Sequence, residues 1–190
     1  MPTIITHTVV AGTAGLSFAP KAVPARFWVL SALCSVIPDA DVATFFFGIP
    51  YGHPLGHRGF FHSPFFGLLA GVVAVFLFFR DVKFLSRRWL FLAAYFALVT
   101  ASHGILDAFT DGGLGIALLS PFDSRRYFFP WTPIVVSPIG IAGMFSKWGL
   151  EVMRSELVWI WLPCLFVVIM RALTRSAWFK RGSSSNVSCG

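Results

Sequence analysis

The sequence predicts an all-α fold, a polytopic membrane bundle of about five transmembrane helices with one re-entrant or interfacial segment. Of its 190 residues, 56% are hydrophobic and only 12% are charged, and the mean hydropathy is +0.76. Soluble domains carry roughly twice that share of charged residues. Five apolar windows approach the ~20 residues that a helix needs to cross a bilayer. Basic residues also gather in alternate loops between these windows, as in multi-pass proteins.

Each window is bounded by residues that interrupt an apolar helix. A sixth apolar stretch, 133–145, contains Pro and Gly and is too short to cross, so we expect it to be re-entrant or interfacial. No Lys or Arg precedes the first window, so we expect no cleaved signal peptide there. We expect a single integral membrane domain over 1–180 and a disordered polar tail over 181–190. The five windows are 4–19, 27–47, 64–79, 89–110 and 156–170.

The charge pattern predicts the orientation of the chain. Fifteen Lys and Arg residues against eight Asp and Glu give a net charge of +7, and ten of the fifteen fall in the loops after the first, third and fifth windows. Cytoplasmic loops are enriched in Lys and Arg. The N-terminus is therefore predicted outside and the C-terminus inside. No nucleic-acid-binding motif accompanies the basic excess, so we expect a membrane partner and no nucleic acid.

Ionisable residues gather near the outer ends of four of these helices. Four of the five histidines and four of the eight acids fall at this depth. A buried Asp or His costs several kcal/mol unless a partner compensates it, and one divalent cation can compensate several at once. The sequence therefore predicts a metal site. Its candidate ligands are His7, Asp39, Asp41, His57, His62, His103, Asp107 and Asp111.

The spacing of these residues predicts how they meet. His103 and Asp107 are four residues apart and share one helix face, and Asp111 joins them if the helix persists to Gly112 and Gly113. An i,i+4 pair contributes only ~0.2 to 0.5 kcal/mol, too little to offset burial in lipid, so we favour ligands over a structural pair.

Asp39 and Asp41 would diverge on a regular helix, but Pro38 can disturb the backbone and turn both inward. Ser63 followed by Pro64 predicts an N-cap and a first helical residue, which places His62 just before a helix.

The donor set predicts the metal and its chemistry. Imidazole and carboxylate without thiolate suit Zn²⁺, with Mn²⁺ or Fe also possible. Eight ligands exceed the needs of one tetrahedral ion, so two or three ions are expected, an arrangement that typically hydrolyses phosphate esters. Asp39 or Asp41 would act as base or bridging ligand. Arg58 would either clamp a substrate phosphate or anchor a lipid headgroup. Arg125 and Arg126 are read as interfacial side chains that snorkel.

A His near the N-terminus, then PDAD, GHRGFFHS and HGILD, in this order over residues 7 to about 131, resembles the YdjM-like inner-membrane proteins, described as membrane-bound metal-dependent hydrolases. That family is in turn distantly similar to zinc-dependent phospholipase C and S1/P1 nuclease, helical enzymes that use three zinc ions. The resemblance implies a bacterial inner-membrane location. It departs at Phe61, where many relatives have Thr, and in the longer loop TDGGLGIALLSP. It assigns as ligands His7, Asp39, His57 or His62, His103, Asp107 and Asp111.

The predicted function is a membrane-embedded metal-dependent hydrolase, a phosphoesterase or phospholipase that acts on a lipid-borne phosphate at the outer face of the inner membrane. Phe45, Phe46, Phe47, Phe60 and Phe61 would admit its acyl or prenyl chain sideways. One alternative is a divalent-cation transporter or channel, although no ionisable residue continues toward the inner face. The other is a scaffold in which a metal staples short helices without catalysis.

The orientation can be tested by labelling. We expect Gly52 outside and Arg87 inside, because of the ten-to-five basic bias. In intact cells, a Gly52→Cys variant should react with a membrane-impermeant thiol reagent, whereas Arg87→Cys should not. Reaction of Arg87→Cys would contradict this orientation.

Overall fold

The computed structural model describes all residues except 20–22, 139, 141 and 185–190, and the side chains of 176–184. The predicted helical class is confirmed, and within the described residues the β-structure is limited to two isolated bridges, Thr110 with Ile134 and Ile116 with Tyr127. The helices are α1 (Ile4–Phe18), α2 (Ala25–Val36), η1 (Ile37–Phe47), η2 (Phe60–His62), α3 (Pro64–Phe78), α4 (Arg87–Asp107), η3 (Ala142–Phe145), α5 (Lys147–Glu156), η4 (Leu157–Trp161) and α6 (Leu162–Ser184).

Short polar residues start the helices. Thr3, Ser63, Ser86 and Ser146 each cap a helix by accepting a hydrogen bond from the backbone N–H three residues further on. Such a cap satisfies one of the free N–H groups of the first turn. The predicted start of a helix after Ser63 is confirmed, which fixes where His62 stands.

Three helical runs are long and apolar enough to cross a membrane: Ala25–Phe47, Arg87–Asp107 and Lys147–Arg175. Two shorter apolar helices, α1 and α3, have 15 residues each. At 1.5 Å per residue each reaches ~22 Å, less than the ~30 Å of a hydrocarbon core.

The helix bounds differ from the sequence windows in three places. The second run is α-helical only to Val36 and continues as the 3₁₀ helix η1. The fourth ends at Asp107, before the predicted 110, so the condition under which Asp111 would share the face of His103 and Asp107 is not met. The last begins at Lys147 rather than 156, because α5, the π-turn η4 and α6 follow without a break. The described part of 133–145 is irregular apart from η3, and α6 ends at Ser184, so residues 185–190 of the expected tail lie outside the described chain.

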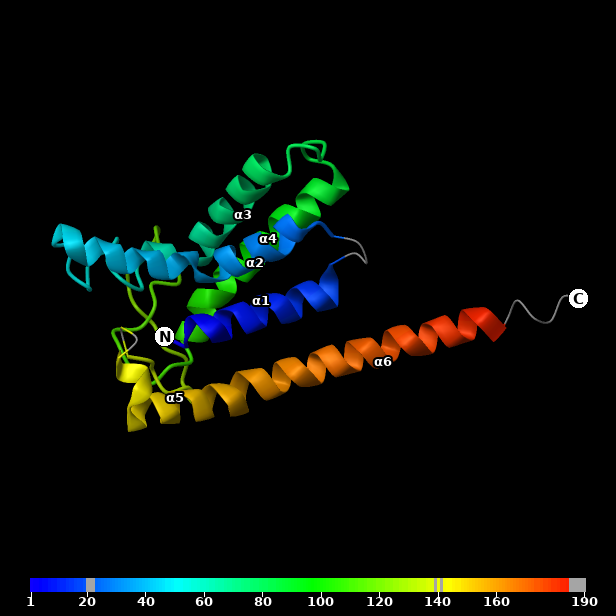
Figure 1. Cartoon of the computed structure of the whole chain (residues 1–190). Coiled ribbons are helices and arrows are strands. Elements are labelled where there is room, and N and C mark those ends of the chain that lie inside the picture. Colours follow the sequence, from blue (N-terminus) through cyan, green and yellow to red (C-terminus); the bar gives the residue numbers. More distant parts are fainter. Residues whose placement is uncertain (20–22, 139, 141, 185–190) are drawn as a thin grey trace, which may run out of the picture.

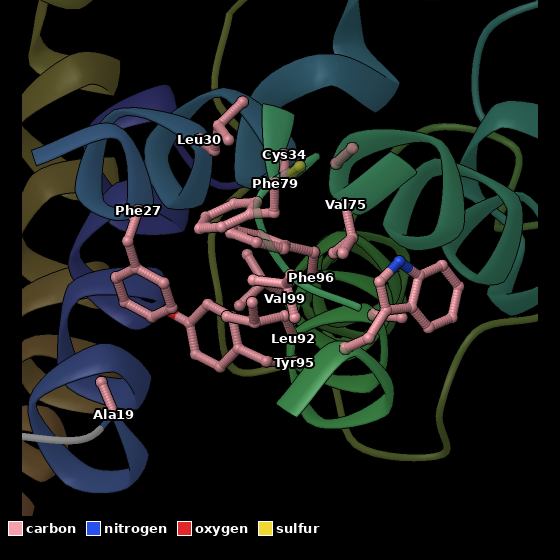
Figure 2. Packing of buried hydrophobic residues seen from close by; sticks show 14 of the residues in the cluster. Ala19, Phe27, Leu30, Cys34, Val75, Phe79, Leu92, Tyr95, Phe96 and Val99 are labelled. Carbon is pink, nitrogen blue, oxygen red and sulfur yellow. The ribbon is translucent and has the colours of Figure 1, made fainter. Parts of the chain in front are cut away.

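The apolar core lies between α1, α2, α3 and α4. Phe27 from α2 stacks on Tyr95 from α4 with ring centroids 4.7 Å apart, and Phe79 packs against Phe96 (Figure 2). The Tyr95 hydroxyl lies 3.0 Å from Ser31 Oγ and donates to the Ala11 carbonyl. This core therefore links three helices through both apolar and polar contacts.

The bundle has two different ends (Figure 1). The end of α1, the start of α2 and the α3–α4 connection lie at one end, and Arg26 pairs there with Asp81 at 2.7 Å. The loops that follow η1 and α4 gather at the other end, beside the start of α1 and α5. Helix α6 runs along α1 and then extends past the bundle. The polar residues of interest all belong to the end opposite Arg26.

Helices α3 and α4 pack closely because small residues face each other. A Cβ added at Gly71 would lie 2.4 Å from the Ala97 N and 2.5 Å from the Ala93 O, both backbone atoms that cannot move aside. Small residues at such positions allow membrane helices to approach. Gly12 of α1, by contrast, has open space where its Cβ would stand.

These two glycines give a matched test of packing. Gly71→Ala should destabilise the protein by about 1–3 kcal/mol, because α3 must move away from α4. Gly12→Ala should stabilise it by about 0.5–1 kcal/mol through helix propensity alone. Thermal unfolding in detergent measures both, and an equal shift in the two variants would contradict the close approach.

Candidate metal centre

The 3₁₀ helix η1 turns Asp39 and Asp41 toward the bundle. Two residues two positions apart are separated by about 160° on an α-helix but by about 120° on a 3₁₀ helix. Pro38 stands at the start of η1, and both Asp39 and Asp41 are buried. The structure therefore brings both carboxylates inside, and the reason lies in the helix type.

Asp39 meets two histidines from different segments. Its Oδ1 lies 3.2 Å from His103 Nε2 and 3.5 Å from His62 Nε2. His62 Nε2 is also 3.5 Å from Asp107 Oδ2. The approach of η2 to α4 depends on Gly104, where a Cβ would lie 2.0 Å from the His62 carbonyl oxygen. A side chain at position 104 would thus push His62 out of the cluster.

His7 completes the cluster from α1. Its ring stacks on His103 with centroids 3.7 Å apart, and its Nε2 lies 3.5 Å from Asp107 Oδ1. Helix α1 starts at Ile4, so its cap at Thr3 sets the position of His7 one turn later.

Several polar atoms of this cluster are buried without a hydrogen-bond partner among the described residues. The polar atoms of buried side chains almost always have one. The imidazole and carboxylate atoms among them come from four separate segments, and those of Asp39, His62 and Asp107 belong to one group spaced closely enough to hold a cation. They are His7 Nδ1 and Nε2, Asp39 Oδ2, His62 Nδ1 and Nε2, and Asp107 Oδ1 and Oδ2; Arg58 Nε, a donor that cannot bind a cation, is buried beside them.

Two overlapping groups of side chains have the spacing to hold an ion. The first is Asp39, His62, His103 and Asp107, and the second is Asp41, His57 and His62. Both are fully buried, and they share His62 through its two ring nitrogens. The described residues thus offer two positions for an ion, fewer than the upper expectation of three.

Polar contacts to one ring nitrogen of His103 and of His57 orient these candidate ligands. The His103 Nδ1 donates to the Ser35 carbonyl at 2.7 Å, which leaves Nε2 free to bind an ion. His57 Nδ1 lies 2.6 Å from Asp41 Oδ1. A carbonyl or carboxylate on the far nitrogen fixes the tautomer of a metal-binding histidine. The first group therefore has the better-defined donors.

The electrostatics of the first group favour a cation. Burial disfavours the protonated ring of His62, but interactions with Asp39 and Asp41 outweigh it and raise the pKa of His62 to about 9. The three buried carboxylates Asp39, Asp41 and Asp107 thus favour a positive charge at the position of His62. A metal ion that binds His62 must replace the proton on its ring.

Arg58 lies within the cluster rather than at a headgroup position. It is almost fully buried, and its Nε stands 3.5 Å from Asp107 Oδ2. Its guanidinium donates to Thr110 Oγ1 and to the Gly112 carbonyl, while its backbone N–H donates to Asp41. The backbone of Arg58 has φ +63°, a strained conformation for a non-glycine residue that is typical of functional sites.

A polar cavity of about 320 Å³ opens beside Arg58. His57, Arg58, Tyr51 and Trp148 line it. Gly113, with φ +93°, also lines it, and a Cβ there would lie 2.5 Å from an Arg58 nitrogen. Burial raises the pKa of Tyr51, so its hydroxyl remains a donor. The cavity therefore borders the cluster through Arg58, His57 and Tyr51, although apolar atoms make up most of its wall.

The structure does not bring every candidate to the site. Asp111 is exposed, and its Oδ1 accepts a hydrogen bond from the Val136 N–H, because α4 ends one turn earlier. Arg125 pairs with Asp123 on the surface. The interpretation of Arg126 as a snorkelling side chain is wrong, since it donates to the carbonyls of Tyr51 and His57 and holds their loop.

Sequence reasoning missed Glu156. This carboxylate at the end of α5 is fully buried and accepts hydrogen bonds from the Thr3 N–H and from the hydroxyls of Thr3 and Thr6. Trp161 Nε1 also donates to Thr6. Glu156 therefore ties the last membrane run to the first turn of α1, next to His7. The available signal was a Glu at the first residue of the apolar window 156–170.

Glu156→Gln should lower stability by about 1–3 kcal/mol, because an amide cannot accept all three hydrogen bonds. Glu151→Gln is the matched control on the same helix, where the side chain is exposed, and should change stability by less than about 0.5 kcal/mol. Thermal unfolding in detergent compares them. Equal melting temperatures for both variants and the parent protein would show that Glu156 does not hold α1.

Comparisons with known proteins cover nearly the whole chain. The inner membrane protein YbcI of Escherichia coli (strain K12) is 39% identical over 171 residues, 90% of this chain and 96% of that protein. No solved structure matches, so the more distant similarity to phospholipase C and S1/P1 nuclease stays a prediction. The family described as YdjM inner membrane protein matches residues 1–179, a range that contains every residue of the cluster. The chain therefore belongs to the YdjM inner membrane protein family.

Proposed function

We propose that the protein is a metal-dependent hydrolase that cleaves a phosphate ester of a membrane lipid. The observation that carries this proposal is the set of buried, unpartnered imidazole and carboxylate atoms that lie beside a cavity lined by Arg58 and His57. The site belongs to the outer face of the bacterial inner membrane, as the basic loops at the opposite end indicate.

The donor chemistry suits Zn²⁺, with Mn²⁺ or Fe as alternatives. Asp39, His62, His103 and Asp107 would hold the first ion, with His7 adjacent. His57 and Asp41 would hold a second ion together with the other nitrogen of His62. Such ions, when bound, activate water for attack and stabilise charge on a phosphoryl group.

The residues of the chain supply the remaining steps. The guanidinium of Arg58 neutralises charge on the phosphate, held in place by Thr110 and Gly112. His57 lines the cavity, and its Nδ1 contacts Asp41. When only the first ion is bound, His57 Nε2 would be available to accept a proton from water or to donate one to the leaving oxygen. Asp41 thus orients both His57 and His62.

The apolar core argues against a cation transporter. Between the cluster and the opposite end, the described bundle is filled by aromatic and aliphatic side chains such as Phe27, Phe96 and Val99. An ion pathway requires polar partners along its length. If the protein is instead a scaffold whose helices are held by a metal, the other alternative, we expect bound metal without turnover.

A panel of substrates separates these functions. Purified protein loaded with Zn²⁺ would be incubated with phospholipids, prenyl phosphates and a generic phosphodiester, and products read by mass. Release of phosphate or a phosphorylated headgroup supports the hydrolase. Bound metal with no product from any of them indicates the scaffold.

Asp107→Asn should abolish activity and lower bound metal by at least one ion, because the amide keeps the shape but loses the charge that balances the cation. Asp111→Asn is the matched control four residues away, outside the cluster, and should retain both the activity and the bound metal of the parent protein. Metal stoichiometry and product formation are measured on the same preparations. Full metal occupancy and full activity in Asp107→Asn would end the metallohydrolase proposal.

A further inference from the structure

A second cavity adjoins the polar one. It has a volume of about 300 Å³ and is lined mainly by apolar side chains from the first turn of α1 and from the segment before α5, among them Ile4, Ile5, Pro138 and Met144. The two cavities share Met1 and Ser137 as lining residues. A backbone hydrogen bond from Ser137 to the Met1 carbonyl holds these two residues together. The polar and apolar cavities are therefore neighbours.

The two cavities differ in chemistry. The polar one presents Arg58, His57 and Tyr51 beside the carboxylate cluster. Among the described residues, no charged side chain lines the apolar one. Ile4 and Ile5 are 57% and 55% exposed, on a helix apolar enough to stand in the bilayer, so this cavity faces the lipid boundary. A ligand that fills both must carry an anion at one end and hydrocarbon at the other.

We propose that these two cavities form one site for a single-chain lipid phosphate, with the phosphate beside Arg58 and the hydrocarbon chain along Ile4, Ile5 and Met144. This inference rests on the proposed function and names its substrate class. A water molecule occupies about 30 Å³ and a methylene group is of similar size, so 300 Å³ suits about ten methylene groups of one chain.

Two other positions for the hydrocarbon chain of the ligand are less consistent with the residues that line the cavities. The exposed Phe46 and Phe47, expected from the sequence to guide it, line neither cavity. A further apolar groove of about 320 Å³ lies between α1 and α4, with Phe18 and Phe91 in its lining, but it shares no residue with the polar cavity. A chain in that groove would leave its phosphate away from Arg58.

Photo-crosslinking locates the hydrocarbon chain of the bound ligand directly. The probe is decyl phosphate with a diazirine at the end of its chain, added to Zn²⁺-loaded full-length protein in phosphatidylcholine nanodiscs. We expect adducts at Ile4, Ile5 or Met144 that unlabelled decyl phosphate suppresses and decanol does not. Adducts in the α1–α4 groove, or equal suppression by decanol, would overturn the proposal.

A cavity-filling variant tests the same point by affinity. Ile5→Trp should weaken decyl phosphate binding at least tenfold and leave ethyl phosphate binding unchanged, as measured by calorimetry. Ile105→Trp, at an exposed isoleucine of α4 outside both cavities, should change neither. An unchanged affinity of Ile5→Trp for decyl phosphate would refute the proposed position of the hydrocarbon chain beside Ile5.

Failure of this inference can be told apart from failure of the hydrolase proposal. Correct labelling and chain-dependent binding without product formation would refute the hydrolase and support the two-part site. The opposite result would be hydrolysis of both ethyl and decyl phosphate, equal affinity for the two, and no label at Ile4, Ile5 or Met144. It would support the hydrolase and refute the two-part site.

Discussion

The polar end of this protein is organised by the cost of keeping three carboxylates away from water. Asp39, Asp41 and Asp107 are all buried in a chain whose neighbouring helices are apolar. An unpaired buried charge costs several kcal/mol, so each carboxylate needs a partner close by. Arg58 and His62 offset part of this charge, and the unpartnered atoms that remain call for a cation. The geometry of the loops follows from that requirement.

Apolar packing makes this convergence possible. The ring of Phe27 stacks on Tyr95 and packs at an angle against Phe96, and these contacts fix α2 relative to α4. Gly71 lets α3 approach α4, and Gly104 then lets the turn before α3 deliver His62 beside His103. The site is thus positioned by contacts between small residues, where an added methyl group would separate the helices.

The last membrane run also contributes to the site, although none of its residues is a candidate ligand. Glu156 holds the cap of α1 through Thr3 and Thr6, one turn before His7. The segment before α5 supplies Pro138 and Met144 to the apolar cavity. The region beyond the cluster therefore shapes both the position of His7 and the wall of the apolar cavity.

The sequence by itself determined the features that depend on near neighbours: the helical class, the helix start at Ser63, and the shared face of His103 and Asp107. It also predicted that Pro38 would let Asp39 and Asp41 turn inward. Only the tertiary structure decided that Asp111 lies apart, that Arg126 holds a loop and that Glu156 caps α1 from 153 residues away. Helical periodicity and capping are local properties of the chain, whereas partners for buried polar groups depend on which distant segments pack together.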